Sequence, residues 1–273
     1  MNRKSFSVLF LLFALTSPIF GATDSANGPE RREWKVDGVA REALIHVPSK
    51  ATSSPAPLVF VFHGHGGNMN NAARMFGIHT RWPDAIVVYP QGLNTPGRLT
   101  DPDGKAPGWQ KNVGDQSDRD LKFFDAVLAS LKKDYKVDSK RIYSTGHSNG
   151  GAFTYLLLAA RGDVFAAVAP SAAAYFSALN PKAGTYSPRP IMHLGAENDP
   201  LVKFEWQKET MDTFRKLNQC GDGKSWMNDK DCTIYESKVN APVVTFLHSG
   251  RHSFPARGAD LIVKFFKQHP GSP

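Results

Sequence analysis

The segment that decides the fold reads R-I-Y-S-T-G-H-S-N-G-G-A-F and spans residues 141–153. An apolar, β-branched run at residues 142–145 meets a glycine-rich turn, and a helix-forming run follows the turn. The turn carries the pattern G-x-S-x-G, with Ser148 between Gly146 and Gly150. In a strand–turn–helix context this pattern holds the serine on a strained bend, so that its Oγ projects above the end of a sheet. The alternative is an ordinary Gly/Ser turn ahead of a helix.

Apolar runs of strand length alternate with helical patterns along the chain. The expected strands are nearly all apolar, which is typical of strands buried on both faces of a parallel sheet; they lie at residues 58–62, 85–89, 165–169, 190–194 and 243–248. Helices are expected at residues 72–79, at 150–160, at 204–217, at 259–268 and after a capping box at Ser117-x-x-Asp120. This alternation predicts an α/β fold, with a mostly parallel central sheet and helices on both faces.

Residues 1–21 are predicted to be a secretory signal peptide. Arg3 and Lys4 precede an apolar stretch at residues 6–15, and cleavage is expected near Gly21. The apolar stretch is shorter than the roughly 20 residues of a membrane span, although an uncleaved anchor is the alternative. The sequence therefore predicts a secreted protein, extracellular or periplasmic.

The remaining chain is expected to form one domain. Residues 22–32 are small and polar and are predicted to be a mobile tail, whereas residues 33–273 form the catalytic domain. This domain is expected to open with a hairpin, because Asp37-Gly38 favours a tight turn between two strands.

The charge of the chain is basic but scattered. The formal net charge of +8 falls to +6 when the two cations of the signal peptide are removed. No dense block of Lys and Arg is interleaved with aromatic residues, which argues against nucleic-acid binding. The charge favours solubility and some attraction to an acidic substrate or surface, and we expect a monomer without a membrane span.

The two cysteines, Cys220 and Cys232, are expected to form a disulfide. Export points to an oxidising compartment, in which two cysteines of a secreted domain usually pair. Two free thiols are the alternative. Two cysteines cannot make a zinc site alone, and no histidine stands at ligand spacing from them, so no metal is expected.

A nucleophilic serine needs a base and an acid that orients the base. In hydrolases built on a sheet of this kind, the acid and then the histidine follow the serine along the chain. The acid is expected where the strand at residues 190–194 ends, and Asp199 is the better candidate. Glu197 is the second candidate, and capping ahead of Pro200 is the bland alternative for Asp199.

The base is expected in the loop after the last strand. His252 lies in that loop and is preferred over His248, which stands at the end of the strand and is expected to line the pocket. The histidines at positions 63, 65 and 147 all precede Ser148 and are expected to line the pocket or contact backbone.

The oxyanion hole needs two N–H donors near the serine. One is expected to be the backbone of Asn149, directly after the nucleophile, and the other comes from the loop after the strand at residues 58–62. That loop reads H-G-H-G-G, and its donor is placed at Gly64 or His65. A phosphate-binding loop is the alternative, but no G-K-[ST] follows.

Residues 94–112 form a long loop rich in proline and glycine, and a loop of this length in a compact domain is usually functional. Together these motifs resemble the secreted poly(3-hydroxybutyrate) depolymerase and feruloyl esterase group of the α/β-hydrolases. The resemblance covers about residues 44–266 and is carried by V-F-H-G-H-G-G at 61–67, Y-P-Q-G at 89–92, G-W-Q-K-N-V-G-D at 108–115, R-I-Y-S-T-G-H-S-N-G-G at 141–151, N-D-P-L-V at 198–202 and R-H-S-F-P at 251–255.

The resemblance implies a Ser148, Asp199 and His252 triad without a metal or organic cofactor, and it places Trp109 beside the cleft. Trp109 and His147 are both expected to contact substrate. His65 and the R-H-S-F-P loop depart from the group's usual residues. The resemblance therefore does not identify the residues of the acyl and alcohol pockets. The substrates implied are soluble or oligomeric esters, such as plant cell-wall polysaccharide esters or hydroxyalkanoate oligomers. A serine peptidase and a non-catalytic binding protein of the same fold are the alternatives.

Overall fold

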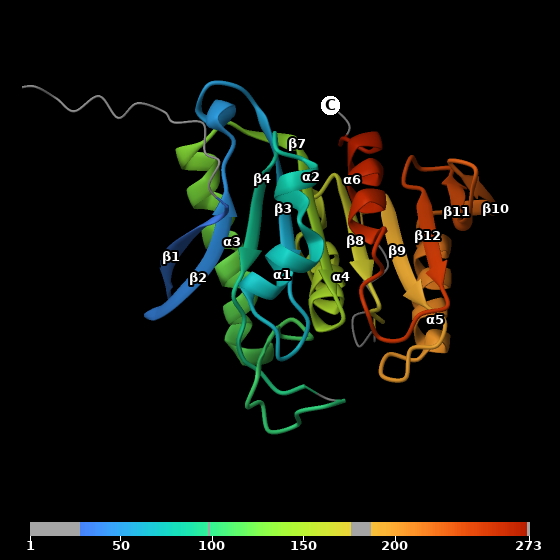
Figure 1. Ribbon diagram of the computed structural model, residues 1–273, viewed down its shortest axis with the longest axis horizontal. Helices are drawn as coiled ribbons and strands as arrows, with labels where there is room; N and C mark the ends of the chain where they lie inside the picture. Colours follow the sequence, from blue (N-terminus) through green and yellow to red (C-terminus); the bar gives the residue numbers. More distant parts are fainter. Residues whose placement is uncertain (1–27, 98, 176–186, 272–273) are drawn as a thin grey trace, which may run out of the picture.

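The computed structural model describes residues 28–97, 99–175 and 187–271 (Figure 1). The predicted signal peptide, residues 1–21, lies outside the described residues. Within them the chain forms a sheet of ten strands in the order β1-β2-β4-β3-β7-β8-β9-β12-β11-β10. The strands are β1 (Glu30–Val36), β2 (Val39–His46), β3 (Ala56–Phe62), β4 (Ile86–Pro90), β7 (Val137–His147), β8 (Ala167–Ser171), β9 (Ile191–Ala196), β10 (Cys220–Trp226), β11 (Asp229–Ser237) and β12 (Val243–His248).

The six central strands, from β4 to β12 in the sheet order, run parallel, and two antiparallel strands flank them at each edge. The predicted hairpin at Asp37-Gly38 is present as β1 and β2. Strand β1 begins at Glu30, so the last three residues of the expected tail belong to the sheet. The β10–β11 hairpin was not expected, because β10 is mostly exposed and reads C-G-D-G-K-S-W, without an apolar pattern.

Helices cover both faces of the sheet, as predicted (Figure 1). One face carries α1 (Met69–Phe76), α2 (Ile78–Arg81) and α6 (Gly258–Gln268), and the other carries α3 (Arg119–Asp134), α4 (Asn149–Arg161) and α5 (Phe204–Leu217). Single-turn 3-10 helices are η1 (Ser49–Thr52), η2 (Asp115–Asp118) and η3 (Gly162–Val164). The order of strands and helices is that of an α/β-hydrolase fold.

Strand β3 shows why an unbroken apolar run belongs in the centre of this sheet. Phe60 and Phe62 point to the core under α3 and α4, whereas Val59 and Val61 point to the core under α1 and α6. All four side chains have 1% exposure or less. Because both faces are covered, each successive side chain must be apolar.

The expected disulfide between Cys220 and Cys232 is not formed: both cysteines are free thiols in the structure. The strand register explains this result. Cys220 of β10 lies opposite Ser237 of β11, whereas Cys232 lies five positions back along β11, opposite Phe246 of β12. Five strand residues span about 16 Å, and a disulfide needs Cα atoms closer than about 7 Å.

The long loop after β4 is not entirely irregular. It contains a small antiparallel pair, β5 (Leu93–Asn94) with β6 (Pro107–Gly108).

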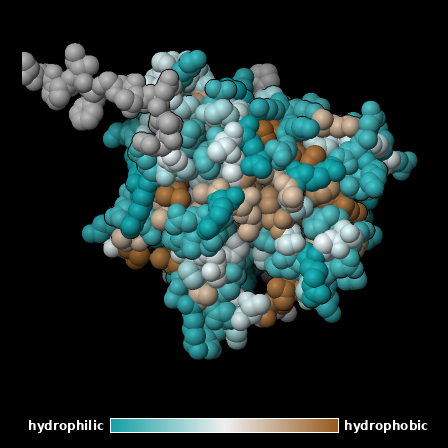
Figure 2. Space-filling view, viewed as in Figure 1, coloured by the Kyte–Doolittle hydropathy of each residue, from teal (hydrophilic) through white to brown (hydrophobic). Residues whose placement is uncertain are grey.

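The face of the molecule seen in Figure 2 is mostly hydrophilic, and its hydrophobic residues form small separate areas. Among the described residues, no helix has the length and apolar character needed to span a bilayer.

Candidate active site

Four loops meet at the carboxyl edge of the parallel strands. His63 and Gly64 follow β3, Ser148 follows β7, Asp199 lies beyond the end of β9, and His252 lies beyond the end of β12. The strands β3, β7, β8, β9 and β12 are consecutive neighbours in the sheet. Parallel strands bring their carboxyl ends to one edge, so residues distant in sequence come together there.

Ser148 sits on the strained turn that the sequence predicted. Its backbone has φ 57° and ψ −120°, a conformation that L-residues seldom adopt. Gly146 and Gly150 make this turn possible, because a Cβ on Gly146 would lie 2.4 Å from the carbonyl oxygen of Gly150. A Cβ on Gly150 would lie 2.4 Å from the carbonyl oxygen of Phe62 on β3. The serine is thus held at the end of β7 and the start of α4.

The structure brings the three predicted triad residues into one hydrogen-bonded chain. His252 Nε2 lies 2.8 Å from Ser148 Oγ, and His252 Nδ1 lies 2.7 Å from Asp199 Oδ2. With a proton on Nδ1 donated to the carboxylate, Nε2 is the acceptor that faces the serine hydroxyl. This is the arrangement in which an imidazole can remove the proton of a serine.

Asp199 is fixed by its own neighbourhood. Its Oδ1 accepts hydrogen bonds from the backbone N–H groups of Leu201 at 2.8 Å and Val202 at 2.9 Å. The side chain is fully buried, so Oδ2 remains for His252. Glu197, the second candidate, is exposed and directs its backbone N–H to the carbonyl of His248. The structure therefore places Asp199, and not Glu197, against His252.

A buried polar network behind Asp199 was not apparent from the sequence. Gln207 of α5 donates through Nε2 to Val202 O at 2.6 Å and to Asp199 Oδ2 at 3.4 Å. Its Oε1 faces His193 Nε2 at 3.4 Å, and His193 Nδ1 lies 2.6 Å from the hydroxyl of Tyr155. Burial lowers the pKa of His193 to about 4, so it is neutral near pH 7. No sequence spacing relates these residues, which is why sequence reasoning missed them.

His147 packs on His252, the predicted base. Its ring centroid is 5.0 Å from that of His252, its side chain is 6% exposed, and its Nδ1 lies 3.2 Å from Ser171 Oγ. Burial, together with the nearby His252, lowers the pKa of His147 to about 3. A neutral ring in contact with His252 supports the orientation of the base, and this location leaves His147 little surface for the predicted substrate contact.

The predicted oxyanion loop lies against the serine. A Cβ on Gly64 would be 3.5 Å from Ser148 Cβ, which places this backbone beside the nucleophile. His63 Nε2 accepts a hydrogen bond from Gly92 N at 2.9 Å, and its Nδ1 lies 2.8 Å from Gly64 O. Burial lowers the pKa of His63 to about 4, so the neutral ring links the loops after β3 and β4. His65 Nε2 lies 3.1 Å from Asp101 Oδ2 in the long loop.

Asn149, the second predicted oxyanion residue, is anchored through its side chain. Its Oδ1 accepts from Trp109 N at 2.7 Å, and its Nδ2 donates to Trp109 O at 3.1 Å. These two bonds hold the long loop against the start of α4. The backbone N–H of Asn149, next to Ser148, is thereby fixed in orientation.

The expected substrate contact of Trp109 is wrong for this structure, because the side chain has 0% exposure. The indole Nε1 donates to His63 O at 2.9 Å, and the ring stacks on Phe153 with centroids 5.3 Å apart. Trp109 therefore belongs to the core beneath the site. It joins the predicted oxyanion loop to helix α4, and none of its side-chain surface is exposed.

The capping box at Ser117 is also wrong. Ser117 and Asp118 have positive φ, and the first residue of α3 receives no side-chain cap from Asp118. Gln110 caps the helix instead, because its Oε1 accepts from Asp120 N at 3.1 Å and Leu121 N at 3.3 Å.

Within the described residues, no group of three or more potential ligands could hold a metal ion.

Known proteins share both the fold and parts of the sequence. The sequence profile of the prolyl oligopeptidase family matches residues 108–219, which include Ser148 and Asp199. The solved structure of an acetyl xylan esterase from Aspergillus awamori superposes with a TM-score of 0.57 at 15% identity, covering 87% of this chain and 99% of that one. The protein has the α/β-hydrolase fold.

Two curated relatives indicate which class of enzyme the sequence is similar to. A feruloyl esterase C from Emericella nidulans is 28% identical over 232 residues, which are 81% of this chain and 78% of that protein. A bifunctional acetylxylan esterase/xylanase, XynS20E, from Neocallimastix patriciarum is 26% identical over 191 residues, 67% of this chain and 25% of that protein. By sequence, the chain is thus similar to esterases, and by structure it has the fold that these enzymes share with other α/β-hydrolases.

Proposed function

We propose that this protein is a serine carboxylic-ester hydrolase in which Ser148 is the nucleophile, His252 the base and Asp199 the acid. The observation that carries the proposal is the continuous chain of contacts, 2.8 Å from serine to imidazole and 2.7 Å from imidazole to carboxylate. The strained backbone of Ser148 supports it, because such a turn aims Oγ away from the sheet.

In the first half of the reaction, Ser148 Oγ attacks the ester carbonyl while His252 Nε2 takes the hydroxyl proton. Asp199, paired with Nδ1, stabilises the imidazolium that forms. The negative charge on the carbonyl oxygen is stabilised by the backbone N–H of Asn149 and by one N–H from the Gly64–His65 turn. Collapse of the tetrahedral intermediate breaks the ester C–O bond, and His252 returns the proton to the leaving alcohol.

In the second half, water attacks the acyl-enzyme. The oxygen of the water bonds to the acyl carbon while His252 takes one proton from that water. The oxyanion donors stabilise the second tetrahedral intermediate that forms. Breakage of the bond to Ser148 Oγ releases the carboxylic acid, and the serine recovers its proton from His252. These steps use only side chains and backbone groups of the chain.

The substrates we propose are feruloyl and acetyl esters of plant cell-wall polysaccharides, acted on by a secreted, monomeric enzyme. The names of the two curated relatives support this substrate class. The apolar segment at residues 6–15 supports secretion. The sequence also resembles poly(3-hydroxybutyrate) depolymerases, so hydroxyalkanoate oligomers are the competing substrates to test.

A serine peptidase is the second candidate, favoured by the match of residues 108–219 to the prolyl oligopeptidase family. That match ends well before His252, so it covers only part of the proposed triad. Hydrolysis of a peptide substrate at a rate comparable with the ester rate would favour this candidate.

The decisive experiment compares the wild-type protein with Ser148→Ala on p-nitrophenyl acetate and on a prolyl p-nitroanilide peptide. We expect the wild type to hydrolyse the ester, and Ser148→Ala to reduce the ester rate to background with the same melting temperature. Methyl ferulate, acetylated xylan and hydroxybutyrate oligomers then rank the substrates. An unchanged ester rate in Ser148→Ala would remove the proposed nucleophile.

A further inference from the structure

A buried ion pair lies outside the catalytic residues described above. Arg41 of β2 directs Nη2 to Asp120 Oδ1 of α3 at 2.9 Å, and the two side chains are 1% and 0% exposed. Burying two charges is costly unless their remaining hydrogen-bonding atoms are satisfied. Arg41 Nε has no hydrogen-bond partner among the described residues, but the other polar atoms of the pair are bonded, and their partners indicate what the pair does.

The second carboxylate oxygen of Asp120 holds the end of the long loop. Asp120 Oδ2 accepts a hydrogen bond from Gln110 N at 2.9 Å, and Gln110 Oε1 accepts hydrogen bonds from the N–H groups of Asp120 and Leu121 in the first turn of α3. The residue before Gln110 is Trp109, whose backbone is bonded at both N and O to the Asn149 side chain. A continuous set of short contacts thus leads from Asp120 to the residue beside the nucleophile.

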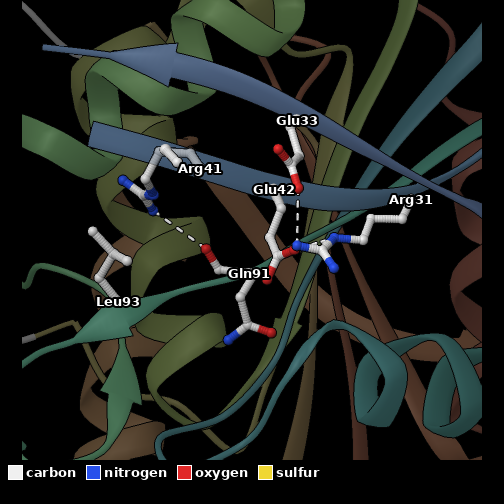
Figure 3. A pocket seen from close by; sticks show the side chains of 7 residues that line it. Arg31, Glu33, Arg41, Glu42, Gln91 and Leu93 are labelled. Atoms are coloured by element: carbon white, nitrogen blue, oxygen red, sulfur yellow. Dashed lines mark hydrogen bonds and ion pairs between the residues drawn. The ribbon is translucent and has the colours of Figure 1, made fainter. Parts of the chain in front are cut away.

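Arg41 holds a second loop in the same way. Figure 3 shows its guanidinium pointing toward Gln91, and Nη2 donates to Gln91 O at 3.3 Å, while Nη1 donates to Arg119 O at 3.1 Å. The residue after Gln91 is Gly92, whose N–H is bound by His63 Nε2. His63 in turn precedes Gly64, so this set of contacts ends at the other predicted oxyanion donor.

We propose that Arg41 and Asp120 are positioning residues that fix both halves of the oxyanion hole from β2 and α3. This inference rests on the proposed function, because an oxyanion hole has a role only if acyl transfer occurs at Ser148. Both side chains are buried, so neither is available to contact a substrate. Their effect reaches the reaction through the backbone of residues 109–110 on one side and 91–92 on the other.

The test uses Asp120→Asn, which keeps the size of the side chain and removes its charge. Reactive serines are counted by exhaustive labelling with a fluorophosphonate, and kcat on p-nitrophenyl acetate is expressed per labelled serine. We expect kcat to fall about tenfold with KM changed less than threefold, because misaligned donors weaken transition-state binding alone. Asn149→Ala, which keeps its backbone N–H but releases Trp109, should also lower kcat at least tenfold.

The double variant Asp120→Asn/Asn149→Ala separates positioning from stability. If Asp120 acts through Trp109 and Asn149, the double variant should be no slower than Asn149→Ala within about twofold. The matched control is Asp125→Asn, on the same helix, which breaks the half-exposed pair with Arg161 at 2.8 Å. The control should leave kcat per labelled serine unchanged and combine additively with Asn149→Ala.

Two results would overturn the inference. One is an unchanged kcat per labelled serine in Asp120→Asn together with a lower melting temperature, which would make the pair purely structural. The other is a fully additive double variant. If Asp120→Asn does not fold, Arg41→Lys replaces it, because lysine keeps a cation for Asp120 but cannot also reach Gln91 O. This variant should lower kcat per labelled serine about threefold or more. An unchanged value would overturn the inference. Absence of ester hydrolysis in the wild type would instead remove the proposed function.

Discussion

The two sides of Ser148 are built in different ways. On the base side, the groups proposed to act are side chains in direct contact. His252 is hydrogen-bonded to Asp199 through Nδ1 and to Ser148 through Nε2. On the oxyanion side, the proposed donors are backbone N–H groups at Asn149 and in the Gly64–His65 turn. Side chains enter there only as supports.

This difference determines how substitutions act on each side. Changing one side chain on the base side removes an acting group outright. On the oxyanion side the backbone donors stay in the chain, and a substitution can only shift them. Because electrostatic stabilisation of the oxyanion depends on distance and direction, shifts of this kind should give graded losses. Base-side losses should be large and oxyanion-side losses moderate.

The largest effect is expected from Asp199→Asn. An amide in place of the carboxylate favours the wrong imidazole tautomer and cannot stabilise the imidazolium, so kcat should fall about 10⁴-fold, the loss known for the equivalent change in serine proteases. The measurement is steady-state kinetics on p-nitrophenyl acetate at pH 7. Glu197→Gln is the matched control, because Glu197 is exposed, and it should cost less than tenfold. A crippled Glu197→Gln beside a nearly normal Asp199→Asn would reassign the acid.

A smaller loss is expected from Trp109→Phe on the oxyanion side. Phenylalanine keeps an aromatic ring against Phe153 but loses the Nε1 donor that binds His63 O at 2.9 Å. We expect kcat to fall about tenfold with KM unchanged, because a side chain with 0% exposure does not contact substrate. A raised KM with an unchanged kcat would show that Trp109 binds substrate after all.

The two sides also differ in how well they could be predicted from sequence. Ser148, Asp199 and His252 each follow a strand that is recognisable as an apolar run, and parallel strands place their carboxyl ends together. Local pattern plus fold class was therefore enough to predict that these three side chains meet. The position of Asp199 before Pro200 and of His252 in a loop needed no knowledge of packing.

The supports could not be predicted, because they act across elements. Gln110 caps α3 from a loop that the sequence marked only by its prolines and glycines. Trp109 looked like a cleft aromatic, and only packing against Phe62, His63 and Phe153 shows that it is buried. The cysteine pairing failed for the same reason: Cys220 and Cys232 are near in sequence, but strand register sets their separation.

Acid should weaken the fold on both sides of the site. Burial lowers the pKa of His63 and of His193 to about 4, from 6.5. Between pH 6.5 and 4 the unfolded chain binds protons that the folded chain excludes, so stability is present above that range and is lost as pH falls through it. Over the whole range from pH 6.5 to 4, each histidine accounts for a loss on the order of 3 kcal/mol.

Urea unfolding at pH 7 and pH 5 measures the first part of this loss, about 2 kcal/mol for each histidine. His193→Gln removes the titrating group behind Asp199 and leaves His63 in place, so the difference in free energy of unfolding between the two pH values should shrink by the share due to His193. An equal difference in wild type and variant would show that His193 does not cause acid destabilisation. The corresponding His63→Gln variant reports the oxyanion side.

The smallest effect is expected from reduction. A disulfide between β10 and β11 would brace the hairpin next to β12, the strand that leads to His252, and would give the base side a covalent support that the oxyanion side lacks. The register forbids it, since Cys220 lies opposite Ser237 and Cys232 lies opposite Phe246. A bridge would require moving one strand along the other by about 16 Å. We therefore expect dithiothreitol to change neither the melting temperature nor the esterase rate, and we expect thiol labelling of the denatured, unreduced protein to give two modified cysteines. A fall in melting temperature of several degrees on reduction, with no label incorporated beforehand, would mean that the hairpin adopts a different register from the one described and that the base side is covalently braced.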